Sequence, residues 1–126
     1  MSKEKPRILL VEDNLLVSTA LQDILSEDGF EIQTAGTGKE AEALIKDISF
    51  SLVLLDLMLP DTNGFILCAE IRNTPAISHI PVIITTGLAD REDVVKAHQA
   101  GANDYIVKPF TLITVMEKVD KFLPEH

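Results

Sequence analysis

The sequence predicts an α/β fold, a doubly wound sheet of five parallel strands in which each strand is followed by a helix. Short apolar runs alternate along the chain with segments of helical periodicity, and this order is typical of repeated strand–helix units. Apolar runs of this length fit strands that are covered on both faces, as in a parallel sheet. The connections between such strands are expected to be right-handed.

The expected strands are the five apolar runs. They read RILLV, EIQTA, SLVLLD, PVIITT and DYIVK, and they occupy residues 7–11, 31–35, 51–56, 81–86 and 104–108.

The expected helices lie between and after these strands, where apolar residues recur with a spacing of three or four. The spacing is clearest near the end of the chain, at Leu112, Val115, Met116, Val119, Phe122 and Leu123. The same spacing occurs in two earlier segments. One contains Val17, Leu21, Ile24 and Leu25, and the other contains Ala41, Leu44, Ile45 and Ile48. Helices over 64–73 and 90–100 rest on weaker patterns; the second has acids in its first turn, Asp90, Glu92 and Asp93. Gly29 and Gly101 stand where helices are expected to end.

Length and composition indicate one globular domain spanning residues 1–126, large enough for a single core. Hydrophobic residues make up 46% of the chain and charged residues 25%, which argues against disorder. The net charge of −9 disfavours direct binding to nucleic acid and suits a divalent cation or a basic partner. The single cysteine, Cys68, excludes an internal disulfide. Without an apolar run of membrane-spanning length, we expect a cytoplasmic protein that does not bind membranes.

Asp56 is a single carboxylate inside the most apolar stretch of the chain, residues 51–60. Burying an unpaired carboxylate costs several kcal/mol, so this residue either leaves the core at the end of its strand or meets a cation. Polar residues also follow other strands: Glu12 and Asp13 come after the first, and Lys108 ends the fifth. Ligands of doubly wound folds bind at the carboxyl ends of the strands, so we expect these side chains to meet at one rim.

The residue types at this rim suit phosphoryl transfer. Grouped carboxylates repel one another, and Mg2+ resolves this conflict by binding one or two of them together with water and phosphate oxygens. A carboxylate can attack phosphorus, and a lysine or a hydroxyl such as that of Thr86 can bind phosphoryl oxygens. Taken singly, each residue has an ordinary alternative: a solvated turn acid, an acid pair preceding a helix cap at Asn14, or a surface lysine.

The chain resembles the receiver domains of two-component response regulators, including the chemotaxis receivers, over essentially its whole length. The matching features occur in the expected order at the expected strand ends; they are the Glu12–Asp13 pair, Asp56 with Pro60 four residues later, Gly64, Thr86, Tyr105 and the Lys108–Pro109 pair. The resemblance implies a flavodoxin-like strand order, 2-1-3-4-5.

The resemblance implies that Asp56 is the phosphoacceptor, which becomes a 4-aspartylphosphate by transfer from a sensor histidine kinase or a phosphotransfer protein. It implies Mg2+ as the cofactor, held by Asp13 directly, by Glu12 through water, by Asp56 and by the backbone carbonyl of Met58. Lys108 would bind the phosphoryl group, and its peptide bond to the following proline is expected to be cis.

The resemblance further implies a switch. Thr86 would supply the switch hydroxyl, with Thr85 facing the opposite way, and Tyr105 would turn inward when Thr86 moves. The changed surface would be that of the fourth helix, the fifth strand and the fifth helix, which would contact an effector domain or target protein or form a homodimer. Gly87 departs from the alanine that is common in the family, and we expect it to loosen the following loop.

Three other functions are alternatives to this switch. A phosphatase with an aspartate nucleophile requires a second acid two residues after the nucleophile, where this chain has Met58. A flavin or nucleotide site requires a glycine- or hydroxyl-rich loop after the first strand, where residues 12–14 read EDN, while GTGK at 36–39 fits a turn and a helix start. An interaction scaffold that is not phosphorylated would not need the rim residues. We therefore expect a phosphoacceptor switch rather than a turnover enzyme, one that assists its own phosphorylation and dephosphorylation.

Overall fold

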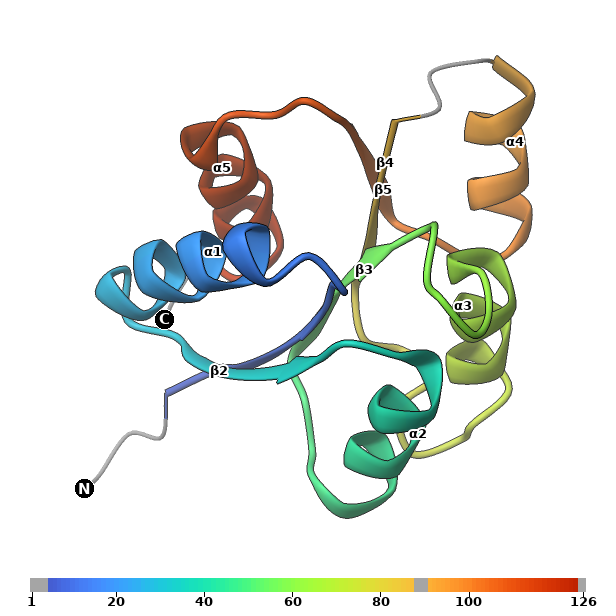
Figure 1. The fold of residues 1–126 in the computed structure, drawn as a ribbon. Coiled ribbons are helices and arrows are strands. Elements are labelled where there is room, and N and C mark those ends of the chain that lie inside the picture. Colours follow the sequence, from blue (N-terminus) through green and yellow to red (C-terminus); the bar gives the residue numbers. More distant parts are fainter. Residues whose placement is uncertain (1–4, 88–90, 125–126) are drawn as a thin grey trace.

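The computed structural model describes residues 5–87 and 91–124, and its elements alternate strictly between strand and helix (Figure 1). In chain order they are β1 (Arg7–Val11), α1 (Leu15–Glu27), β2 (Glu31–Ala35), α2 (Gly38–Asp47), β3 (Leu52–Asp56), α3 (Gly64–Arg72), β4 (Val82–Thr86), α4 (Arg91–Gln99), β5 (Asp104–Val107) and α5 (Leu112–Phe122). The predicted fold class is confirmed, and the strands agree with the predicted runs to within one residue at each end. Asp90, expected in the first turn of α4, lies outside the described residues.

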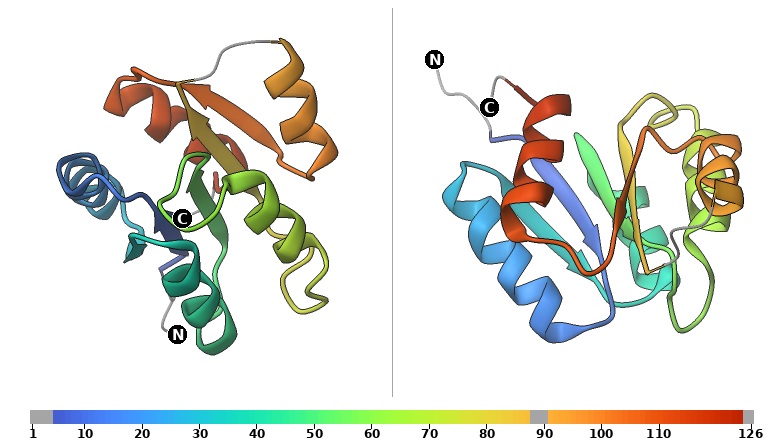
Figure 2. Two further views of the ribbon diagram at one scale, coloured as in Figure 1. Left: turned by 45° about the vertical axis from the view of Figure 1, so that its right-hand side comes forward. Right: turned by 90° about the horizontal axis from the view of Figure 1, so that it is seen from above.

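The sheet is parallel throughout, in the order β2-β1-β3-β4-β5, as expected from the resemblance. Helices α1 and α5 cover one face, and α2, α3 and α4 cover the other (Figures 1 and 2). The chain moves outward from β1 to β2 and then returns to β3 on the other side of β1. The carboxyl ends of β1 and β3 therefore flank the switch point in strand order, where ligands of this fold class bind.

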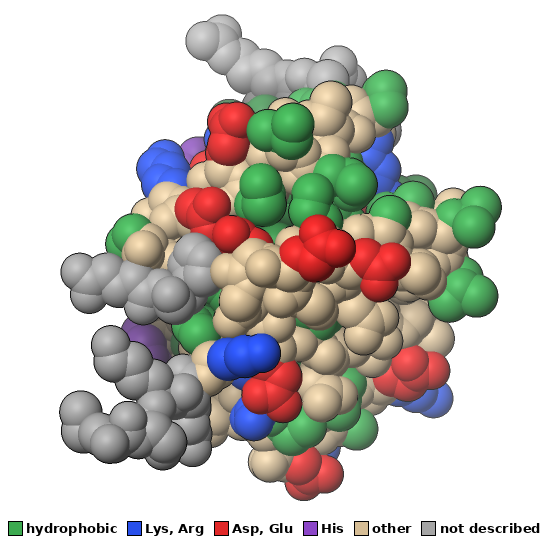
Figure 3. All heavy atoms as spheres, turned by 90° about the vertical axis from the view of Figure 1, so that its left-hand side faces the viewer, with side chains coloured by type: hydrophobic (Ala, Val, Ile, Leu, Met, Phe, Trp, Pro, Cys, Tyr) green, Lys and Arg blue, Asp and Glu red, His purple; other side chains and the backbone are tan. Residues whose placement is uncertain are grey.

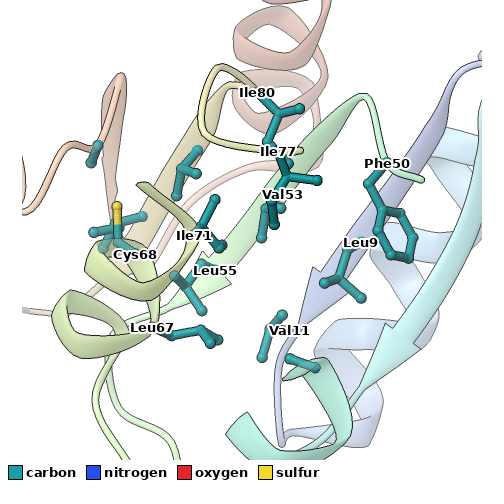
Figure 4. Close-up of a cluster of buried hydrophobic side chains, with 14 of the residues drawn as sticks. Leu9, Val11, Phe50, Val53, Leu55, Leu67, Cys68, Ile71, Ile77 and Ile80 are labelled. Atoms are coloured by element: carbon teal, nitrogen blue, oxygen red, sulfur yellow. The ribbon is translucent and has the colours of Figure 1, made fainter. Parts of the chain in front are cut away.

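The core has two halves, because successive residues of each strand face opposite sides of the sheet. On the side of α2, α3 and α4, strand residues such as Val53 and Leu55 pack with Leu67 and Ile71 of α3 (Figure 4). On the side of α1 and α5, the buried set includes Ile8, Leu10, Leu21, Leu25, Leu52, Leu54, Val115 and Val119. Both faces of the central strands are buried, which explains their continuous apolar sequences.

Short polar side chains begin four of the helices. Each accepts a hydrogen bond from a backbone N–H of the first helical turn, and these N-cap residues are Asn14, Thr37, Asn63 and Thr111. Gly29 and Gly101 follow α1 and α4 with φ of 99°, a backbone conformation that favours glycine, so both predicted helix ends are confirmed.

No helix in the described part of the chain is long and apolar enough to cross a membrane. On the face that Figure 3 shows, acidic side chains are spread among apolar ones and do not form one block.

Candidate functional site

The structure brings three predicted acids together at the carboxyl ends of two neighbouring strands. Glu12 and Asp13 directly follow β1, and Asp56 is the last residue of β3. The two strands are paired in register, with Val11 beside Leu55. As a result, carboxylate oxygens of the three acids lie within 4.8 Å of one another.

Asp56 is almost completely buried, with 4% of its surface exposed, yet both of its carboxylate oxygens are hydrogen-bonded. Oδ1 accepts from the backbone N–H of Met58 at 3.2 Å, and Oδ2 accepts from Lys108 Nζ at 3.1 Å. The single acid in the apolar stretch therefore stays buried at the end of its strand and, of the two expected solutions, it is the cation beside it that compensates its burial.

Lys108 bridges the two buried acids, because its Nζ also lies 3.0 Å from Glu12 Oε1. Burial of the amine lowers its pKa, but the hydrogen bonds to Glu12 and Asp56 outweigh burial and hold the pKa of Lys108 above its usual value. Lys108 follows β5, its backbone N–H donates to the carbonyl of Thr86 at 2.6 Å, and its bond to Pro109 is cis, as expected.

Glu12 carries the main electrostatic cost of the site. Burial raises the pKa of its carboxyl, and the nearby Asp56 raises it further, while hydrogen bonds from the Asn14 N–H and from Lys108 lower it; the net pKa is raised. Asp13 is exposed and, within the described part of the chain, forms no hydrogen bond or ion pair. The ionised site therefore lacks positive charge, and this deficit predicts a pH effect.

Glu12→Gln should remove a loss of stability that appears as the pH rises. The folded-state pKa of Glu12 lies above its unfolded value, so its contribution to stability is fully present below the unfolded pKa and is lost as pH rises through the folded pKa. In metal-free buffer, the free energy of unfolding of the variant relative to the parent should therefore increase from about pH 4 to about pH 7. Urea unfolding at a series of pH values measures this difference. Glu117→Gln, an exposed site on α5, is the control, and a pH-independent difference for Glu12→Gln would contradict the interpretation.

The two predicted switch residues lie on one face of the sheet. Thr86 ends β4 with no exposed surface, and Tyr105 of β5 is paired with Ile84, two residues before Thr86. By strand alternation, Thr86 and Tyr105 face the side of α4, whereas Thr85, which is paired with Asp56, faces the other side. Tyr105 is half-buried against the core cluster of that side.

The β3–α3 loop (residues 57–63) folds back over the end of β3. The Gly64 N–H donates to the carbonyl of Leu57 at 2.8 Å. A Cβ on Gly64 would lie 2.9 Å from the Leu57 Cα and 3.0 Å from the Asp56 carbonyl oxygen, so only glycine allows this close approach. The side chain of Met58 is 65% exposed, while its N–H is bonded to Asp56.

Sequence reasoning did not identify Asp61, which lies in this loop. Its carboxylate accepts hydrogen bonds from the backbone N–H groups of Gly38 and Lys39 at the start of α2. These bonds, the one from Gly38 foremost, lower the pKa of Asp61. The only available signal was the glycine- and lysine-containing stretch at 36–39, where a helix start was predicted but not its acidic partner.

The donor set at the rim fits a hard divalent cation. Carboxylate oxygens are the protein ligands that Mg2+ prefers, and a site with one or two of them leaves positions for water and phosphate oxygens. Three acids meet at this rim around a single lysine that already pairs with two of them, so the residues present suit Mg2+.

Comparisons with known proteins agree with this geometry. The response regulator receiver domain family matches residues 8–120. Among solved structures, the non-phosphorylated HemR receiver domain from Leptospira biflexa is 34% identical and superposes with a TM-score of 0.88, with 97% of each chain covered.

The chain matches nearly the full length of one relative but only about half of another. Chemotaxis protein CheY-3 of Vibrio cholerae is 38% identical over 116 residues, which are 91% of this chain and 89% of that protein. The phosphate regulon transcriptional regulatory protein PhoB of Rhizobium meliloti is 36% identical over 118 residues, which are 94% of this chain but 52% of that protein. The chain spans about half the length of the transcriptional regulators it matches. With its fold, its acidic rim and a family match along most of its length, the chain belongs to the response regulator receiver domain family.

Proposed function

We propose that this chain is a phosphorylation switch that accepts a phosphoryl group on Asp56 in a Mg2+-dependent reaction. Receiver domains of two-component systems are signalling switches, and they typically bind Mg2+ at an acidic pocket. The observation that carries the proposal is the position of Asp56: a nearly buried carboxylate that lies 3.1 Å from Lys108 Nζ and close to two further acids.

The donor proposed is a phosphohistidine of a sensor histidine kinase or phosphotransfer protein. A carboxylate oxygen of Asp56 forms a bond to phosphorus while the phosphorus–nitrogen bond of the donor breaks. The electron pair of that bond returns to the imidazole, which takes a proton from solvent. Alignment and charge neutralisation are the main requirements of such a transfer, and the Lys108 ammonium beside Asp56 supplies positive charge for a phosphoryl oxygen.

Four residues would hold Mg2+: Asp13 and Asp56 through their carboxylates, Met58 through its backbone carbonyl, and Glu12 through water. When bound, the cation neutralises the acids and the phosphoryl oxygens. Asp13 suits a ligand role because it is exposed and unpaired in the described part of the chain. Glu12, whose oxygens accept from the Asn14 N–H and from Lys108, takes the outer role that the family resemblance implies.

Apolar side chains beside the rim support the docking of a phosphodonor protein there. Leu15 and Leu16, at the start of α1 immediately after the acids, are 78% and 83% exposed, and Ile113 of α5 is 60% exposed. Exposed apolar residues next to a charged site are typical of a protein-binding surface.

The output surface proposed is that of α4, β5 and α5. Val95 of α4 and Val107 of β5 are large apolar residues on this surface that remain exposed. A downstream effector domain, a target protein or a second copy of the chain would bind there once Thr86 and Tyr105 have changed position.

Phosphorylation by acetyl phosphate tests the proposal. In the presence of Mg2+, the intact mass should increase by one phosphoryl group, and the increase should be absent in Asp56→Asn. In Asp13→Ala, phosphorylation should no longer depend on Mg2+. Asp23 is an exposed acid on α1, and the Asp23→Ala variant should be phosphorylated as the parent is. A mass increase that persists in Asp56→Asn, or that is normal in excess chelator, would refute the proposed site or its metal.

A further inference from the structure

Asp61 connects the β3–α3 loop to the start of α2. Its Oδ1 lies 2.8 Å from the Gly38 N, and its Oδ2 lies 3.1 Å from the Lys39 N. The first N–H groups of a helix have no partner within the helix, and they favour a negative charge. The loop thus supplies a carboxylate to two of these groups, across 23 and 22 residues of sequence.

The start of α2 packs closely against this loop. The Gly38 Cα faces it so closely that a Cβ there would lie 2.5 Å from the Thr62 Cγ2 and 3.4 Å from Asp61 Oδ1. The next N–H of the helix, that of Glu40, is bonded instead to the Thr37 hydroxyl. The stretch GTGK, predicted to be a turn and a helix start, therefore binds an internal carboxylate through the N–H groups of Gly38 and Lys39.

Asp61 makes the long-range side-chain hydrogen bonds of the β3–α3 loop, whose Leu57 and Leu59 pack in the core. Among the described residues, the other side-chain hydrogen bond of this loop is local, from the Ile66 N–H to Asn63 at the start of α3. The opposite end of the loop is fixed at the rim, where the Met58 N–H donates to Asp56 Oδ1. Besides the core packing of Leu57 and Leu59, the loop is therefore hydrogen-bonded to Asp56 at one end and to the start of α2 toward the other.

We propose that Asp61 is a positioning residue for the phosphorylation site. By holding the β3–α3 loop against α2, it sets the position of the Met58 backbone, whose carbonyl is a proposed Mg2+ ligand and whose N–H binds Asp56. This inference rests on the proposed function. Partners that orient metal ligands from outside the coordination sphere typically change metal affinity by about 10- to 100-fold when they are removed.

Mg2+ titrations followed by amide chemical shifts test this role without any phosphoryl transfer. The variants are Asp61→Asn, which keeps one carbonyl acceptor, and Asp61→Ala, which keeps none; Asp23→Ala on α1 is the charge-matched control. Hydrogen exchange of the Gly38 and Lys39 amides reports the contact itself, and thermal unfolding reports stability.

The expected result is a graded increase in the Mg2+ dissociation constant: smallest for Asp61→Asn, about tenfold for Asp61→Ala, and less than about twofold for the control. If Asp61 had a purely structural role, Asp61→Ala would have a lower unfolding temperature but an unchanged Mg2+ dissociation constant. That result would overturn the inference. Unchanged exchange of both amides in Asp61→Ala would overturn it as well. Absence of Mg2+ binding by the parent protein would instead refute the metal in the proposed function, and with it this inference.

Discussion

Arg72→Ala is expected to lower the free energy of unfolding by about 3 kcal/mol, the largest loss of stability that we predict for a residue outside the core. The Arg72 guanidinium donates to the carbonyls of Gly101, Ser78 and Ile80 at 2.8, 3.1 and 2.7 Å, and to Asn103 Oδ1 at 2.6 Å. One side chain thereby connects the end of α3 to the segment before β4 and to the turn before β5. Its removal leaves the partly buried carbonyls of Gly101, Ser78 and Ile80 without this donor, while Asn103 Oδ1 still accepts from the Val82 N–H.

Urea unfolding of Arg72→Ala and Arg72→Lys measures this loss. Lysine keeps the charge but cannot donate in several fixed directions, so Arg72→Lys should recover only a small part of the stability. Arg7→Ala is the control, because among the described residues Arg7 forms a single ion pair, with Glu31 at 3.5 Å, and one hydrogen bond, to the Ser49 carbonyl. Its loss should be about 1 kcal/mol or less. Equal losses for Arg72→Ala and Arg7→Ala would contradict this interpretation.

Thr86→Ala is expected to confine to the rim the structural changes that phosphorylation of Asp56 causes. Thr86 is fully buried at the end of β4, its carbonyl accepts the Lys108 N–H, and Tyr105 lies on the same face of the sheet. In the proposed switch, a phosphoryl group on Asp56 would offer new acceptor oxygens to the Thr86 hydroxyl. Drawing Thr86 toward them would open space into which Tyr105 would rotate, and this would couple a charge event to a packing change.

Amide chemical shifts with and without beryllofluoride, a phosphoryl mimic, measure this coupling. The parent protein should show changes that extend through α4 and β5 to the first turn of α5, whereas Thr86→Ala should show them only near the rim. Thr86→Ser keeps the hydroxyl and should retain most of the response. The coupling free energy of such switches is typically about 1–3 kcal/mol, so part of the parent population should occupy the active arrangement before the mimic binds. Changes of equal extent in the parent and in Thr86→Ala would exclude Thr86 as the link.

The sequence was sufficient to predict the fold and the composition of the rim, because both depend on local patterns. Apolar runs such as residues 52–56 indicate buried strands, and a polar residue at the end of such a run must lie at the edge of the sheet. Parallel strands all present their carboxyl ends at the same edge, so Glu12, Asp56 and Lys108 could be placed at one rim from the element order, whereas the strand order came from the family resemblance.

Contacts between residues that are distant in the sequence could not be predicted in this way. The Asp61–Gly38 bond spans 23 residues and the Arg72–Gly101 bond spans 29, and no periodicity relates the partners. The pairing of Lys108 with Glu12 also depends on side-chain geometry rather than on strand order. Such contacts follow from the packing of elements whose relative positions the hydrophobic pattern leaves open.

The most direct test of the central claim is the chemical identity of the phosphorylated residue. Sodium borohydride reduces an acyl phosphate to a primary alcohol with release of phosphate, so a phosphorylated aspartate becomes homoserine. The protein is treated with acetyl phosphate and Mg2+ and then with borohydride, and the tryptic peptides Ile8–Lys39 and Asp47–Arg72, which contain Asp13 and Asp56, are sequenced by mass spectrometry. We predict homoserine at position 56 alone, and none when the phosphodonor is omitted or a chelator is present. Homoserine at position 13, or an unmodified position 56 in protein that has gained phosphate, would contradict the assignment of Asp56.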